Sequence, residues 1–178
     1  MNTTLSYDKI QPSKYALNYP IYYEYAKQIA LGNITIDEVP VMFKTEAQEL
    51  IDNNDALLAY VREVKWEEIK AHRDYLETHQ LDYNGKILDY DERSALKLEI
   101  ASTGATGAIQ NGLVDADAFA IEWTLKDNTT TQLTYRDLML IPLAAMQYSD
   151  ALHQQGRLYR EQIFTETDIA TIEAITWE

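Results

Sequence analysis

The stretch that most constrains the fold is residues 119–134, FAIEWTLKDNTTTQLT, which has the pattern of a β-hairpin. Four apolar side chains alternate with polar or small ones, so they share one face of a strand. They are Phe119, Ile121, Trp123 and Leu125. Asp127 and Asn128 suit the turn, because both residue types tolerate the positive φ of hairpin turns. A lone hairpin is not stable in water, so helices must cover this apolar face. We therefore predict a hairpin over about residues 118–133, with those four side chains in the core.

Helical periodicity flanks the hairpin on both sides and predicts an α+β fold with a mainly helical N-terminal region. The predicted helices are about residues 20–31, 55–79, 91–102 and 135–164, with a short one capped by Thr165 or Thr167. Trp66, in the second of these, is assigned to the core. Residues 86–90 are apolar enough for a short strand that joins the hairpin. We predict two domains, a helical appendage at residues 1–62 and an α+β domain at residues 63–178.

Two segments carry expectations that only a structure can test. Leu96, Leu98 and Ile100 are available for burial on the helix at residues 91–102. In the long helix, Met139, Leu140, Leu143 and Met146 widen the apolar surface, which suggests burial against the hairpin, and Pro142 is expected to kink that helix.

The glycine-rich segment at residues 102–112, STGATGAIQNG, does not have the spacing of a nucleotide-binding loop. It lacks the Lys-Ser/Thr ending of a P-loop and does not fit G-x-G-x-x-G after a strand. We expect a loosely packed helix end or a loop there.

Composition narrows the class of protein. The net charge is −14, with 15 acidic and 9 basic residues up to residue 90 and 14 and 6 after it. Acidic charge spread in this way repels phosphates, so direct nucleic-acid binding is not expected. The chain has no cysteine, which removes disulfides and thiolate chemistry. It has no membrane-length apolar run and no signal peptide, so a soluble protein made in the cytoplasm is expected.

The residue types that support catalysis are poorly placed. His72 and His79 lie two helical turns apart, whereas a shared metal favours a spacing of four. Asp115 and Asp117 are read as solvated loop carboxylates, and no serine has a G-x-S-x-G context. We therefore predict no catalytic residue, no cofactor and no metal site, and a protein that is not an enzyme.

Contact surfaces are the alternative. The second half of the long helix has a narrow apolar row that suggests a seam against another helix, with a second subunit as one candidate. The tyrosines near residues 15–25 suit core packing or, alternatively, a surface that contacts protein or carbohydrate. The predicted interface residues are Tyr148, Leu152, Tyr159, Ile163, Tyr22 and Tyr23.

Several short motifs recur in a familiar order over the last two thirds of the chain. They are WEEIKAHRD at 66–74, GK at 85–86, DYDERS at 89–94, WTLKDN at 123–128, LT at 133–134 and ITW at 175–177. This order resembles an uncharacterised family of tailed-bacteriophage proteins, found alone or as C-terminal parts of tail-fibre and tail-fibre-assembly-type proteins. The resemblance covers roughly residues 63–178 and brings no catalytic residues.

The resemblance implies a structural or assembly protein of the phage tail, located in the virion and made in the host cytoplasm. It implies other tail or virion proteins as partners, and the seam suggests a homo-oligomer. Two alternatives stay open at this point. One is a small acidic phage inhibitor of a host nuclease or defence complex, motivated by the charge. The other is a glycan-binding receptor-recognition module that uses exposed tyrosine or tryptophan.

Overall fold

The computed structural model describes residues 13–16 and 18–177, so the first 12 residues of the predicted appendage at residues 1–62 lie outside the described part. The chain forms two compact units. Unit 1 comprises Met1–Ala71 and Gly156–Glu178, and unit 2 comprises His72–Gln155. The sequence boundary predicted between residues 62 and 63 is a different division and stays a prediction.

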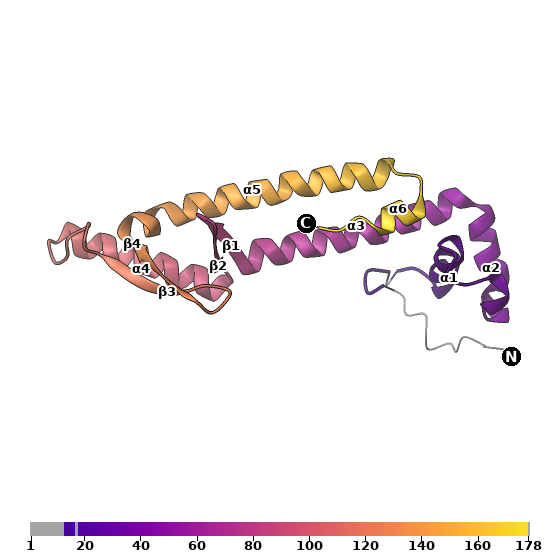
Figure 1. Ribbon diagram of the computed structural model, residues 1–178, viewed down its shortest axis with the longest axis horizontal. Coiled ribbons are helices and arrows are strands. Elements are labelled where there is room, and N and C mark those ends of the chain that lie inside the picture. The colour runs from indigo at the N-terminus through magenta and orange to yellow at the C-terminus, as the bar shows by residue number, and fades with distance from the viewer. Residues whose placement is uncertain (1–12, 17, 178) are drawn as a thin grey trace. The chain divides into compact units, whose positions relative to one another are not determined.

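Unit 1 is helical throughout its described elements (Figure 1). It holds α1 (Ile21–Ala30), the 3₁₀ helix η1 (Ile36–Glu38), α2 (Val41–Asp52), α6 (Ile169–Glu173) and parts of two long helices, α3 (Asn54–His79) and α5 (Tyr135–Thr165). These elements confirm the predicted mainly helical N-terminal region. Gly32 ends α1 at a φ of 73°, as its place after the helix predicts.

The core of unit 1 forms where α3, α5 and α6 present apolar side chains to one another. Leu57 and Tyr60 of α3 are buried together with Ile163 of α5 and Ile172 of α6. The cap of α6 differs from prediction, because the Oδ2 atom of Asp168, and not Thr165 or Thr167, accepts the Thr171 N–H at 2.8 Å.

Unit 2 contains two antiparallel hairpins. The first pairs β1 (Gln80–Tyr83) with β2 (Lys86–Asp89), and the second pairs β3 (Ala120–Thr124) with β4 (Thr130–Thr134). In the second, Trp123 stands opposite Thr131, and Asn128 takes a φ of 65° in the turn. The predicted hairpin is therefore confirmed.

The segment at 86–90 is a strand as predicted, but the two hairpins form separate two-stranded sheets that are linked only locally. Leu88 and Leu125 form an isolated antiparallel bridge, and the Lys126 N–H donates to the Ile87 carbonyl at 2.9 Å. β1 was not predicted as a strand. Asn84 and Gly85 fold it back onto β2 with φ values of 54° and 73°, the left-handed pair that a tight hairpin turn needs.

Helix α4 (Glu92–Gln110) corrects the expectation for the glycine-rich segment, which is helical as far as Gln110. Asp91 caps the helix, since its Oδ1 atom accepts the Ser94 N–H at 2.7 Å. Gly112, with a φ of 68°, follows the end. The core of unit 2 collects Leu98 and Ala105 of α4, Leu81 and Leu88 of the first hairpin, Leu133 of β4, and Leu138 and Ile141 of α5.

None of the helices in the described part of the chain combines the length and apolarity needed to cross a membrane.

Candidate functional site

The start of α5 is fixed by a reciprocal capping arrangement. The Thr134 N–H donates to Oδ2 of Asp137 at 2.9 Å, and the Asp137 N–H donates to Oγ1 of Thr134 at 3.2 Å. The Tyr83 hydroxyl also donates to Oδ1 of Asp137, at 2.8 Å. These bonds tie β1, β4 and α5 together, so the first turn of α5 has a defined position relative to both hairpins.

The titration of this cap follows from its hydrogen bonds. Burial alone would raise the pKa of Asp137, but the bonds from Thr134 and Tyr83 outweigh burial and leave that pKa below its ordinary value. The pKa of Tyr83 is raised, by burial and by its bond to Asp137. The Asp137 side chain is therefore a charged acceptor at neutral pH.

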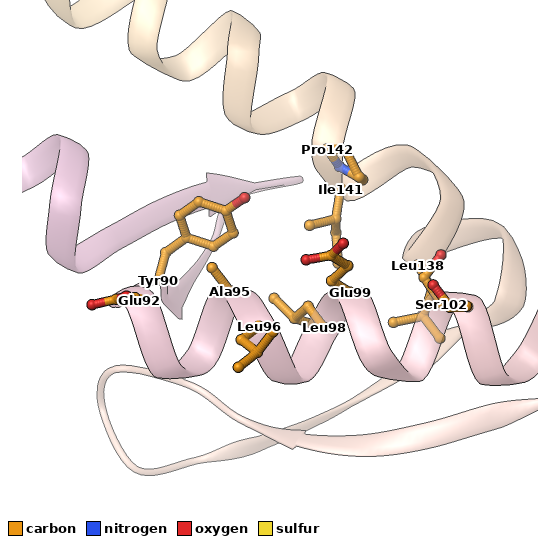
Figure 2. Close-up of a pocket in the computed structure, with 11 residues that line it drawn as sticks. Tyr90, Glu92, Ala95, Leu96, Leu98, Glu99, Ser102, Leu138, Ile141 and Pro142 are labelled. Atoms are coloured by element: carbon orange, nitrogen blue, oxygen red, sulfur yellow. The ribbon is translucent and has the colours of Figure 1, made fainter.

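An open groove of about 560 Å³ lies between α4 and the first turns of α5 (Figure 2). Leu98, Leu138 and Ile141 form its apolar base, and each is at least 96% buried. Leu96, which is 54% exposed, and Pro142 belong to its sides. The α5 ribbon bends beside Pro142, in line with the predicted kink (Figure 2).

Charge along the groove has one sign. Glu92 and Glu99 are its charged lining residues, and both are exposed. Figure 2 shows the Glu99 carboxylate and the Tyr90 ring on the side of α4 that faces Ile141 and Pro142. Burial raises the pKa of Tyr90, so its hydroxyl stays neutral. The groove therefore offers an apolar floor with carboxylates at its edge.

A second, shallower groove of about 460 Å³ lies on another side of α5. It is lined by Leu140, Leu143 and Gln147 of α5 and by Tyr83 and Asn84 at the turn of the first hairpin, among others. Apolar side chains of α5 thus border two open grooves in unit 2.

The predicted interface residues on α5 lie in different environments. Leu152, Tyr159 and Ile163 are buried, and the last two pack in the unit 1 core against residues of α3 and α6. The seam predicted on the second half of α5 is thus filled by side chains of the same chain. Tyr148 is half-buried, and its hydroxyl accepts a hydrogen bond from Nε2 of Gln80 at 3.2 Å.

The predicted tyrosine surface is a packed aromatic cluster. Tyr22 stacks on Tyr23 with ring centroids 5.3 Å apart, and Tyr23 contacts Tyr60 at 5.1 Å. Tyr22 and Tyr23 are half-buried and pack against the unit 1 core. Tyr19 donates a hydrogen bond to Glu63, which raises the pKa of Tyr19 to about 12.

The residues assigned to the core from sequence are half-buried. Phe119, Ile121, Trp123 and Leu125 pack against the unit 2 core, and Trp66 packs against the unit 1 core. The Nε1 atom of Trp123 is buried without a hydrogen-bond partner among the described residues. The Trp66 ring also receives the Lys70 ammonium and the Arg160 guanidinium, at 5.8 and 6.0 Å from its centroid.

Within residues 13–16 and 18–177, no group of three or more histidine, cysteine, aspartate or glutamate side chains is placed to hold a metal ion. His153 lies 3.3 Å from Glu77, an ion pair when the imidazole is protonated. In the loop before β3, the Oδ1 atom of Asp115 accepts the Asp117 N–H at 2.9 Å.

The sequence expectation failed most at the outward side chains of α4 and α5. Leu96 and Ile100 were expected to be available for burial, and Leu143 and Met146 were expected against the hairpin. All four are 52–70% exposed. The width of the apolar surface on these helices could have indicated the exposed apolar side chains, because a helix that packs on one side needs an apolar stripe only about 100° wide.

Comparison with known proteins gives one finding. Residues 60–176 match a family described as Domain of unknown function (DUF4376). No curated protein and no solved structure matches the chain significantly. The match spans most of the chain, including all of unit 2, α6 and most of α3. The chain therefore belongs to the DUF4376 family, whose domain has no assigned function.

Proposed function

We propose that this protein is a bacteriophage tail-associated structural or assembly protein that acts through protein–protein contacts in the virion, without catalysis. The observation that carries the proposal is the open apolar groove between α4 and α5, whose base is formed by Leu98, Leu138 and Ile141. The phage context comes from the motif order described above.

The groove favours a partner of particular chemistry. Its floor suits an apolar side chain, and exposed apolar patches commonly mark protein contacts. Its charged lining residues, Glu92 and Glu99, are both acidic. The partner we propose is a segment of another tail protein that inserts apolar side chains and places lysine or arginine beside these carboxylates.

The test is incorporation into particles. The phage that encodes the chain is grown, its virions are purified, and the chain is quantified against known tail proteins by mass spectrometry. We expect a fixed copy ratio to tail proteins. Absence from particles, together with failure to bind tail proteins during assembly, would refute the proposal.

A matched pair of variants ties that result to the groove. Leu96 lines it and is 54% exposed, whereas Ile100, on the same helix, is 63% exposed and is not among the lining residues. Leu96→Ser should reduce capture of the tail partner, whereas Ile100→Ser should not. Equal effects of the two substitutions would show that tail association does not depend on this groove.

The inhibitor alternative rests on the charge of −14 and is decided in the same experiment. A pull-down from host lysate that recovers a nuclease or a defence complex, with no tail protein from infected cells, would favour the inhibitor.

A further inference from the structure

The outward side of α5 in unit 2 carries a second exposed surface, which we call the outer row. It consists of Arg136, Met139, Leu143, Met146 and Asp150. These residues are spaced by three or four along α5, so they share one face of the helix. All five are exposed, with Leu143 at 52% and Met146 at 70%.

The helix around the outer row is apolar on every side. Residues 138–146, LMLIPLAAM, contain no charged side chain, and the Sδ atom of Met139 accepts weak hydrogen bonds from Ser102 and Thr106 of α4 at 3.5 and 3.7 Å. Leu138 and Ile141 are 1% exposed in the unit 2 core, which accounts for one side of the helix only. A helix that is apolar all round is normally covered all round.

The charges at the two ends of the outer row favour a second copy of α5 as its partner. Arg136 and Asp150 each lie seven residues from Leu143, on opposite sides of it. If two copies of α5 pair antiparallel about a two-fold axis at Leu143, Arg136 of each copy lies opposite Asp150 of the other. A parallel pairing would instead place like charges opposite each other, which is unfavourable.

Both charges are available for this pairing. Arg136 makes no ion pair within the described part of the chain, and Asp150 accepts only from Gln154 of its own helix there, at 2.6 Å. No charged side chain lies between residues 138 and 149, so two acidic molecules can approach here without direct repulsion at the contact. A closed two-fold contact also makes each interaction twice.

We infer that the protein forms an antiparallel dimer in which the outer rows of two copies of α5 pack together with Leu143 at the axis. The inference deepens the proposed function, since it rests on action through protein contacts and names a second copy as one partner. The test of the dimer measures the oligomeric state of the purified chain, whereas the test of the proposed function measures incorporation into virions. Either test can therefore fail while the other succeeds.

The first measurement is the solution mass of the full chain by light scattering and sedimentation equilibrium across a concentration series. We expect twice the 20.5 kDa chain mass. Leu143→Glu should give monomers with an unchanged far-ultraviolet spectrum, because it places two carboxylates at the axis. Leu158→Glu is the control, since Leu158 is 60% exposed on the same helix but lies outside the outer row.

The second measurement is a charge exchange. Arg136→Asp and Asp150→Arg should each weaken dimerisation by roughly tenfold or more, because each sets like charges opposite each other twice. An equimolar mixture of the two variants should dimerise again, since every contact then joins an arginine to an aspartate. The inference is overturned by a wild-type monomer, by a dimer that survives Leu143→Glu, or by failure of the mixture to associate.

Discussion

The two units differ in whether they bury charged side chains. Unit 1 buries charges: Glu24 and Lys27 are 3% and 5% exposed, with Nζ of Lys27 3.1 Å from Oε1 of Glu24 and 3.3 Å from Oε2 of Glu173. The Tyr60 hydroxyl donates to Oε2 of Glu24 at 2.9 Å, and burial raises the pKa of Tyr60. In the described part of unit 2 no charged side chain is buried.

This difference separates a unit whose core includes a charged cluster from a unit whose core does not, although both units expose large apolar side chains. Buried charges persist only when paired, so the cluster of Glu24, Lys27 and Tyr60 requires α1, α3 and α6 to hold one arrangement. The exposed side chains of unit 2 impose no such requirement within the chain. Folding energetics should therefore depend on the buried cluster, and association should depend on the outer surfaces of α4 and α5.

The largest effect is expected from Lys27→Met. The substitution keeps the length of the side chain but leaves the Glu24 carboxylate buried without its cation, which should cost about 3–5 kcal/mol of unfolding free energy. Urea denaturation followed by circular dichroism measures it. The control is Lys44→Met, which removes an exposed pair with Asp37 and should cost less than about 1 kcal/mol. Similar costs for the two variants would show that the buried cluster contributes no more to folding than an exposed pair.

In unit 2 the comparable test is Trp123. Replacement by alanine should cost about 3 kcal/mol, because the indole packs against the core cluster that includes Leu98 and Leu133. Trp123→Phe should cost less than about 1.5 kcal/mol, since it removes an N–H that has no partner among the described residues. Thermal unfolding of both variants gives the values. A folded Trp123→Ala protein that has lost only glycan binding would support the receptor-recognition alternative.

A smaller, pH-dependent effect is expected from Asp137→Asn. Loss of the charged acceptor at the start of α5 should cost about 1 kcal/mol at pH 7. The pKa of Asp137 is lowered from 3.8 in the folded protein, so its contribution is complete above that value and is lost as pH falls through the folded pKa. The stability gap between wild type and variant should therefore close below about pH 4. Asp117→Asn, in an exposed loop, should show no such gap.

The next effect has the opposite sign. Gly104 lies inside α4, and a Cβ atom added there would meet no heavy atom within 4 Å. Gly104→Ala should stabilise unit 2 by about 0.5–1 kcal/mol, through lower entropy of the unfolded chain. Gly112→Ala has the same open space but a φ of 68°, and it should destabilise. Calorimetry of both variants separates helix propensity from backbone strain.

Local features of the sequence were predictable because they are set by neighbours in the chain. Alternation from Phe119 to Leu125 and the turn at Asn128 are enough to predict β3 and β4. The extension of α4 through the glycine-rich segment was not predictable. Glycines disfavour a helix, whereas burial of Ala105 on one side of α4 favours it, and helix propensity alone does not show which effect is larger.

The least predictable feature was whether other side chains of the protein cover a periodic apolar row on a helix. Ile163 and Met146 both sit at helical spacing on α5, yet Ile163 is fully buried and Met146 is 70% exposed. Period determines which residues share a face, and only tertiary structure determines which face is covered. The paired Glu24 and Lys27 illustrate the same limit, since nothing in their local sequence indicates burial.

The smallest effect tests the difference between a buried and an exposed apolar side chain within two turns of α5. Ile141 is 1% exposed and Met146 is 70% exposed, although both belong to the same apolar segment. Met146→Gln should change the unfolding free energy by less than about 0.5 kcal/mol in dilute solution, whereas Ile141→Ala should cost about 2–5 kcal/mol. Chemical denaturation at low protein concentration isolates the chain from self-association. If Met146→Gln cost more than about 1 kcal/mol there, Met146 would be part of the folded core, and the outer row would lose its most exposed apolar side chain as a contact for a second molecule.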